Sequence, residues 1–148
     1  MLTNSQASQK SVLEFSRHLG CYAGDSKGPA IICVGGIHGN EPAGAEALQR
    51  VLEYLHTHQP LFKGRLIGLA GNLGALRRGT RYVHRDLNRM WSPARIRDLK
   101  NKALLEIETA ESQEQRALLA AIEEALEPGD ELKLSELIRP LKPDYDFI

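Results

Sequence analysis

Apolar positions along the chain alternate between short continuous runs and helical spacing. Residues 29–34 form a continuous apolar run that leads into two glycines, which predicts a buried strand. Leucine and valine then recur at three- and four-residue intervals from Leu48 to Leu55, which predicts a helix that ends before Pro60. Residues 64–70 predict a second strand. A strand, a helix and a strand in this order predict a right-handed crossover and a parallel or mixed sheet.

The rest of the chain predicts helices, loops and part of one further strand. Residues 71–91 are rich in Gly, Arg and Asn without a period, which predicts a loop. We interpret residues 1–28 as a polar lead-in and residues 144–148 as the start of another strand. We expect one α/β domain over residues 1–148, with residues 132–148 as a poorly defined tail. Two apolar stripes at helical spacing predict helices, the first with Ile96, Leu99, Ala103 and Ile107, the second with Leu118, Ile122 and Leu126.

Composition narrows the class of protein. The chain has 148 residues, of which 42% are hydrophobic and 26% charged, and these values are ordinary for a globular domain. No apolar run approaches the roughly 20 residues that cross a bilayer, and the N-terminus lacks the pattern of a signal peptide. Two cysteines are too few for a disulfide framework or a cysteine zinc site. We therefore expect a cytoplasmic protein with no membrane partner.

The charges are balanced but unevenly distributed, with 19 basic and 19 acidic residues. Residues 77–102 contain nine basic and two acidic residues, whereas residues 106–131 contain nine acidic residues and one basic one. This leaves two interpretations open: a basic segment and an acidic helix solvated side by side, or arginines that converge on an anionic small molecule. Nucleic-acid binding is not expected, because the arginines do not interleave with a platform for base stacking.

Candidate chemistry lies directly after the first predicted strand, where His38 and Glu41 are three residues apart in a glycine-rich turn. Ligands of open α/β sheets bind outside the carboxyl ends of the strands. Imidazole and carboxylate are both good zinc ligands, and catalytic zinc commonly takes three protein ligands. Taken alone, the residues also allow a surface histidine, an acid at a helix N-terminus, or a phosphate-binding loop. The spacing of Gly35, Gly36 and Gly39 does not match the dinucleotide fingerprint.

An arginine-rich segment follows the second predicted strand. Guanidinium groups hold carboxylates through a planar fork, and an arginine near a polarised carbonyl stabilises the oxyanion that develops there. Residues 38–41 (His-Gly-Asn-Glu), together with Arg81-Tyr82 and residues 86–89 (Asp-Leu-Asn-Arg), closely resemble the succinylglutamate desuccinylase/aspartoacylase family. That family belongs with the zinc carboxypeptidase-like hydrolases. The resemblance spans residue 30 to about residue 92 in the family's order.

The resemblance implies a fold, a cofactor and a reaction. The fold is a zinc carboxypeptidase-like one with a mixed, mostly parallel sheet flanked by helices. The reaction is zinc-dependent hydrolysis of the amide bond of a small anionic N-acyl amino acid. The implied zinc ligands are His38 and Glu41, while Arg81 helps to polarise the scissile carbonyl. The same comparison implies that Asn88 and Arg89 hold a substrate carboxylate, and that Asp86 orients the loop.

The chain departs from the family pattern in one respect. The family takes its third zinc ligand from a later Asp-x-His step and its general base from a glutamate later still, but no histidine follows His84. We therefore expect a truncated N-terminal part of the catalytic domain that binds zinc weakly, and the activity of this form alone is left open. His84 is a less favoured substitute ligand. The acidic residues of the second half are predicted to face solvent and not to act as general base; they are Glu106, Glu108 and Glu111.

Two alternatives to the deacylase remain open. A non-catalytic relative would bind an anionic metabolite or a partner protein through the arginine-rich segment. A metallocarboxypeptidase would act on peptides, because a carboxylate-binding pair such as Asn88 and Arg89 also suits a terminal carboxylate. A partial domain exposes a sheet edge and apolar helix faces, so we also expect self-association or marginal stability.

Overall fold

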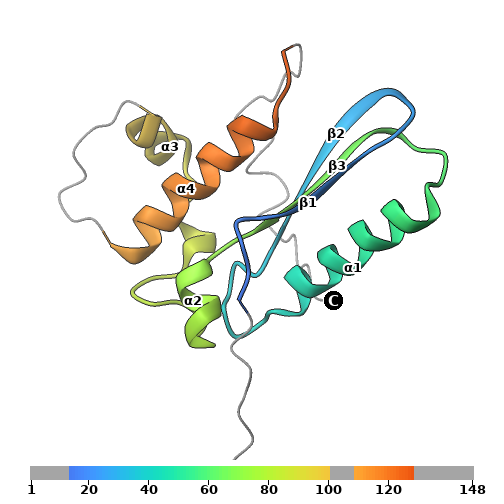
Figure 1. Ribbon diagram of the computed structural model, residues 1–148. Coiled ribbons are helices and arrows are strands. Elements are labelled where there is room, and N and C mark those ends of the chain that lie inside the picture. Colours follow the sequence, from blue (N-terminus) through green and yellow to red (C-terminus); the bar gives the residue numbers. More distant parts are fainter. Residues whose placement is uncertain (1–13, 101–108, 129–148) are drawn as a thin grey trace, which may run out of the picture.

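The computed structural model describes residues 14–100 and 109–128, and its three described strands form one mixed sheet (Figure 1). The strands are β1 (His18–Ala23), β2 (Ser26–Gly35) and β3 (Lys63–Ala70), and their order in the sheet is β1-β3-β2. Strand β2 pairs with β3 in parallel, and β1 pairs with β3 antiparallel. The central strand therefore has one neighbour of each orientation.

This topology confirms part of the sequence prediction and corrects part of it. Both predicted strands lie within β2 and β3, and their parallel pairing agrees with the predicted strand–helix–strand unit. The described sheet is mixed as expected but not mostly parallel, because β1 adds an antiparallel pair. The prediction of a polar lead-in is wrong for β1. This strand buries one side chain, Tyr22, and is held mainly by its backbone ladder with β3, so its apolar pattern is weak.

Helices cover both faces of the sheet. The helix α1 (Ala43–His58) joins β2 to β3, and it contacts all three strands. Figure 1 shows α1 on one face and α3 (Pro93–Lys100) and α4 (Ala110–Ala125) on the other. Within the described residues, none of the helices combines the length and apolar character that crossing a membrane requires.

Two short helices interrupt the segment predicted to be a loop. They are α2 (Leu73–Arg78) and the 3-10 helix η1 (Leu87–Arg89). Each begins at a polar residue, Asn72 or Asp86, whose side chain accepts a hydrogen bond from a backbone N–H of the first turn. These capping bonds stabilise turns that are too short to show an apolar period, so the prediction of a plain loop is wrong here.

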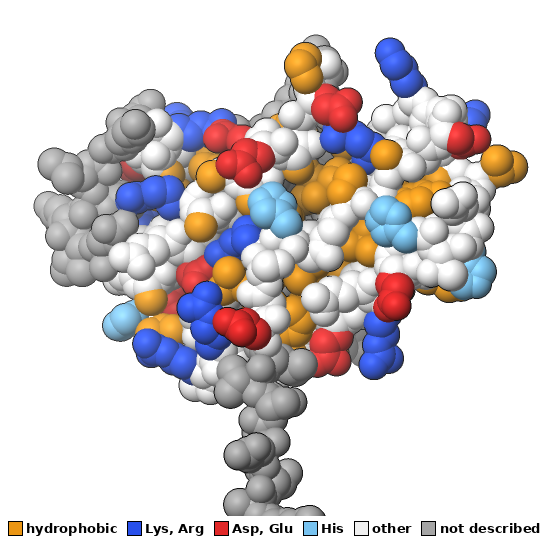
Figure 2. Space-filling view, in the orientation of Figure 1, with side chains coloured by type: hydrophobic (Ala, Val, Ile, Leu, Met, Phe, Trp, Pro, Cys, Tyr) orange, Lys and Arg blue, Asp and Glu red, His pale blue; other side chains and the backbone are white. Residues whose placement is uncertain are grey.

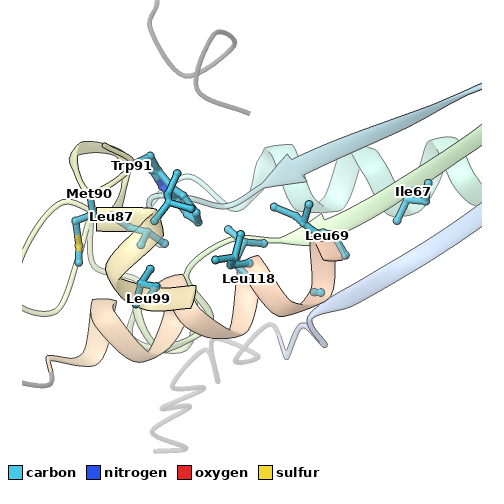
Figure 3. Packing of buried hydrophobic residues seen from close by; sticks show 11 residues of the cluster. Ile67, Leu69, Leu87, Met90, Trp91, Leu99 and Leu118 are labelled. Atoms are coloured by element: carbon cyan, nitrogen blue, oxygen red, sulfur yellow. The ribbon is translucent and has the colours of Figure 1, made fainter. Parts of the chain in front are cut away.

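The larger core lies between the sheet and the helices α3 and α4 (Figure 3). It confirms Ile96, Leu99, Leu118 and Ile122 of the two predicted stripes. Leu126 is not among the core residues, because α4 ends at Ala125, and Ala103 and Ile107 lie outside the described residues. Burying one leucine side chain of this kind contributes about 1.5–3 kcal/mol. Three members come from the end of the arginine-rich segment, which is thereby packed onto α4. The buried members are Ile67, Leu69, Leu87, Met90, Trp91, Ile96, Leu99, Leu118, Leu119, Ala121 and Ile122.

The two oppositely charged segments also pack against each other. Lys100 Nζ lies 2.6 Å from a carboxylate oxygen of Glu123 on α4. Arg95 donates hydrogen bonds to Ser112 and Gln115 of the same helix. Figure 2 shows that one face of the molecule mixes basic and acidic side chains, with hydrophobic side chains visible between them. The basic segment and the acidic helix therefore do not lie independently in solvent.

Candidate metal and substrate site

The parallel register brings the ends of β2 and β3 together. Gly35 is opposite Ala70, and the N–H of Gly71 donates to the carbonyl oxygen of Gly35 at 2.7 Å. The N–H of Asn72 donates to the carbonyl oxygen of Gly36 at 2.9 Å. The segments that follow the two strands therefore start side by side at one edge of the sheet.

The first segment is the turn of residues 36–42 between β2 and α1. Gly36 has a φ of 73°, a conformation that favours glycine. Gly39 runs so close to α2 that a Cβ atom there would lie 2.0 Å from the carbonyl carbon of Ala75. The N–H of Glu41 donates to the carbonyl oxygen of His38 at 3.1 Å. The turn is therefore tight, and it places the side chains of His38 and Glu41 next to each other.

The second segment is the loop of residues 79–90. It is joined to the turn by a backbone hydrogen bond of 3.2 Å from Gly39 N–H to the carbonyl oxygen of Arg81. The Arg81 guanidinium lies 3.7 Å from a carboxylate oxygen of Glu41 and 3.6 Å from one of Asp86. About half of the Arg81 side chain is exposed, so these ion pairs position the group more than they stabilise the fold.

Asp86 connects the two segments. Its Oδ1 accepts hydrogen bonds of 3.0 Å from His38 Nε2 and from the backbone N–H of Asn88. Burial alone would raise the pKa of Asp86, but these hydrogen bonds and the charge of Arg81 hold that pKa below its usual value. The side chain is therefore an anion at neutral pH. Because a carboxylate only accepts hydrogen bonds, His38 carries its proton on Nε2.

This arrangement leaves the other ring nitrogen of His38 available to a metal ion. His38 Nδ1 lies 3.6 Å from Glu41 Oε2. Two ligands about 2.0–2.1 Å from a tetrahedral zinc ion lie about 3.3 Å apart, so this pair fits two of its positions. Residues 14–100 and 109–128 contain no group of three His, Cys, Asp or Glu side chains placed to hold a metal. His84 does not join the pair; it is 61% exposed and its nearest acid is Glu111, at 3.8 Å.

A cavity of about 440 Å³ opens beside these residues, with His38, Glu41 and Asn88 in its lining. Its size is within the range of small-molecule sites. Residues at the end of β2, in the turn that follows it and at the start of α1 form the rest of its wall. Of the predicted carboxylate-binding pair, Asn88 lines this cavity, whereas Arg89 is exposed and does not line it.

Glu111 is the residue that the sequence interpretation missed. It was expected to face solvent, but it is fully buried and accepts hydrogen bonds from the N–H groups of Val83, His84 and Arg85. Burial acts to raise its pKa, and these bonds nevertheless hold that pKa below its usual value. The sequence does contain a sign of this burial, because positions 111, 115, 118 and 122 share one helical face and the last two are apolar. Glu106 and Glu108 lie outside the described residues.

The α/β fold, the histidine–glutamate pair and the adjoining arginine-rich loop define a candidate metal-dependent hydrolase domain. Comparison with known families agrees: the catalytic-domain profile of the succinylglutamate desuccinylase/aspartoacylase family matches residues 27–132, most of the chain. The chain belongs to this family of zinc-dependent deacylases. The predicted family resemblance is therefore confirmed.

The chain covers only a small part of the length of its individual relatives. The succinylglutamate desuccinylase of Serratia proteamaculans is 40% identical over 92 residues, which are 62% of this chain and 26% of that protein. The enzyme of the same name from Erwinia tasmaniensis is 40% identical over 62 residues, which are 42% of this chain and 19% of that protein. The chain thus spans about a quarter or less of the length of these relatives.

Two solved structures are similar to this fold. The succinylglutamate desuccinylase of Chromobacterium violaceum matches with a TM-score of 0.50 and 27% identity, over 67% of this chain and 29% of that one. The Vibrio cholerae protein of the same name matches with a TM-score of 0.52 and 18% identity, over 68% of this chain and 26% of that one. The second match supports the fold alone.

Proposed function

We propose that this chain supplies a zinc-ligand pair and a substrate-binding loop for hydrolysis of the amide bond of small anionic N-acyl amino acids. The observation that carries the proposal is the position of His38 between two carboxylates. Asp86 binds its Nε2 at 3.0 Å, while its Nδ1 faces Glu41 at 3.6 Å. Metal-binding histidines commonly hold a carboxylate on their second nitrogen in this way. The names of the relatives make N-succinylglutamate the substrate to test first.

Each residue has a role that follows from its place. His38 and Glu41 would hold zinc, which supplies a water of lowered pKa and a polarised carbonyl when it is bound. Arg81 offers a positive charge close to Glu41, where it would stabilise negative charge on the carbonyl oxygen of the amide. Asn88 would donate a hydrogen bond from the cavity wall to a substrate carboxylate. A second contact from Arg89 rests on the family resemblance, because this exposed side chain does not line the cavity. A third ligand and a general base are assigned to none of the described residues.

Zinc binding by the whole chain tests the ligand pair. We expect calorimetric titration with Zn²⁺ to show binding that weakens at least about tenfold in His38→Ala and in Glu41→Gln. The matched control is His84→Ala, because this exposed histidine is outside the pair and should leave the affinity unchanged. An unaltered chain that takes up no zinc would end the proposal, as would an equal loss in the control.

Asp86 tests the orientation of the histidine. Asp86→Asn keeps the shape of the side chain but removes its charge, so we expect zinc affinity to fall about 10- to 100-fold, as for other partners of metal-binding histidines. Binding and hydrolysis of N-succinylglutamate then separate the competing functions. A non-catalytic binder would retain ligand binding in His38→Ala, and a metallocarboxypeptidase would prefer a peptide with a free terminal carboxylate.

A further inference from the structure

The N-terminal half of α4 carries a buried polar face. Glu111 and Gln115 are fully buried, Ser112 is 2% exposed, and the Glu114 side chain is 15% exposed. Burial of polar groups is unfavourable unless their hydrogen bonds are made inside the protein. This face therefore needs partners, and apart from the helix cap Thr109 its described hydrogen bonds go to segments that lie earlier in the chain.

Glu111 binds three consecutive backbone N–H groups of the arginine-rich loop. One carboxylate oxygen accepts from Val83 at 2.6 Å, and the other accepts from His84 at 3.0 Å and from Arg85 at 3.3 Å. The side-chain amide of Asn72 donates a fourth hydrogen bond at 3.3 Å. Consecutive N–H groups that converge in this way form an anion-binding nest. Here the anion comes from the protein's own helix.

The residues that flank this nest contact the proposed zinc ligands, Arg81 through Glu41 and Asp86 through His38. Arg81 lies two residues before Val83, and Asp86 directly follows Arg85. Within the described chain, the N–H groups of residues 83–85 donate to no backbone carbonyl, so Glu111 is what holds this stretch.

Two more side chains of α4 hold the two ends of the longer stretch that runs from α2 to the end of η1. Glu114 accepts a hydrogen bond from the N–H of Gly74 at 2.8 Å and pairs with Arg17. Gln115 donates to the carbonyl oxygen of Met90 at 2.7 Å. The helix therefore contacts the beginning, the middle and the end of the stretch from α2 to η1. The middle contact lies nearest in sequence to Arg81 and Asp86.

We propose that Glu111 is the positioning residue for substrate binding: from α4 it holds residues 83–85 so that Arg81 lies beside Glu41 and Asp86 beside His38. The effect on substrate rests on the proposed function, whereas the hold on the loop does not. The carboxylate uses both oxygens to accept from four donors. A glutamine at this position would direct its NH₂ group at N–H donors, so Glu111→Gln disrupts the contact despite its similar shape.

Amide hydrogen exchange on the whole chain tests the hold on the loop directly. We expect the N–H groups of Val83, His84 and Arg85 to exchange at least about 100-fold more slowly than an open loop, because they are hydrogen-bonded. In Glu111→Gln their exchange should accelerate at least about tenfold. The matched control is Glu124→Gln, the same change at an exposed position of the same helix, which should leave exchange as it is.

The unaltered chain decides the matter even where a variant fails to fold, since fast exchange at residues 83–85 overturns the proposal. Glu111→Asp keeps the charge but is one methylene shorter, and it should give a smaller acceleration than Glu111→Gln. Acceleration at these amides that is no greater in Glu111→Gln than in Glu124→Gln also overturns the proposal.

Ligand binding tests the consequence for the site. With Zn²⁺ present, we expect Glu111→Gln to weaken binding of N-succinylglutamate about tenfold. Its zinc affinity should fall less than in Asp86→Asn, because the Asp86 carboxylate that holds His38 is retained and the ligands His38 and Glu41 lie on the other segment. Unchanged ligand binding in a variant with accelerated exchange contradicts the positioning role. If the unaltered chain does not bind N-succinylglutamate, the proposed function fails, while the exchange result still decides whether Glu111 holds the loop.

Discussion

The two segments of the candidate site are stabilised in different ways. The turn of residues 36–42 follows the edge strand β2 and is held by its own backbone and by close packing of Gly39 against α2. The loop of residues 79–90 follows the central strand β3 and is held by side chains of α4. The proposed zinc ligands lie on the first segment and most of the proposed substrate contacts lie on the second. Apart from Asp86, whose contact with His38 joins the loop to the metal ligands, mutations in the turn should mainly affect metal binding and mutations in the loop should mainly affect substrate binding.

The same contrast distinguishes two glutamates. The Glu41 side chain is 63% exposed beside His38, so it can exchange water for a metal ion. The Glu111 side chain is completely buried, and all of its known contacts are within the protein. The carboxylate of Glu41 is thus available to a ligand, whereas that of Glu111 is engaged in hydrogen bonds within the protein. Their identical chemistry shows that burial and hydrogen bonding, rather than residue type, separate the two roles.

The largest expected effect comes from blocking the close approach in the turn. Gly39→Ala would place a Cβ atom 2.0 Å from a backbone carbon of α2, so the backbone must move. We expect this change to lower the free energy of unfolding by about 2–3 kcal/mol, measured by urea denaturation. The control is Gly44→Ala in α1, where the nearest atom is 3.6 Å away and helix propensity favours alanine by about 0.5 kcal/mol. Equal stability of the two variants would refute a packing role for Gly39.

A smaller effect on the free energy of unfolding should appear at acidic pH, and it should depend on the contact between Glu111 and the loop. The pKa of Glu111 is lower in the folded protein than in the unfolded chain, so its contribution to stability is present at neutral pH. This contribution is lost as the pH falls below the unfolded value of about 4.3 and through the folded pKa. Between pH 7 and pH 3, the free energy of unfolding should therefore fall less steeply in Glu111→Gln than in the unaltered protein.

Glu124→Gln again serves as the control for the acid experiment, because it removes an exposed carboxylate from the same helix. Between pH 7 and pH 3, its free energy of unfolding should fall as steeply as that of the unaltered protein. Asp86 has a lowered pKa too, so part of the acid sensitivity should persist in Glu111→Gln. Identical slopes in the unaltered protein and in Glu111→Gln would mean that the carboxylate does not hold the loop through its charge.

The two segments also differ in how well the sequence predicts them. The apolar runs of β2 and β3 and the helical spacing of α1 are local patterns, and the structure contains all three elements. The proximity of His38 and Glu41 follows from their separation of three residues in a tight turn. The association of that turn with the arginine-rich loop came from the family resemblance, since the individual residues do not encode which segments meet.

The α4 contacts could not be predicted in the same way. Glu111 binds backbone N–H groups 26 to 28 residues away, and almost every residue type offers such a group, so its partners have no sequence signature. The shared face with Leu118 and Ile122 could have indicated burial, but the usual preference of glutamate for solvent argued against it. Strand β1 was missed for a related reason, because backbone pairing with β3 rather than an apolar pattern defines it.

The smallest effect concerns the strands that carry the two segments. Strand β3 has a neighbour on each side, whereas β2 has none on its outer edge within the described sheet. Ile31 of this strand is 47% exposed. Exposed apolar edge strands favour pairing between chains, so we expect the chain to self-associate and Ile31→Lys to weaken that association about tenfold, measured by sedimentation.

Leu61→Lys provides the comparison for this edge. Leu61 is 93% exposed but lies in the connection between α1 and β3, so a charge there alters surface hydrophobicity without reaching the strand edge. If self-association proceeds through β2, Ile31→Lys should reduce it and Leu61→Lys should not. A monomeric unaltered chain, or an equal effect of both lysines, would exclude the edge as the interface. Zinc affinity should stay the same in Ile31→Lys, because the metal ligands belong to the turn that follows the strand rather than to the strand itself.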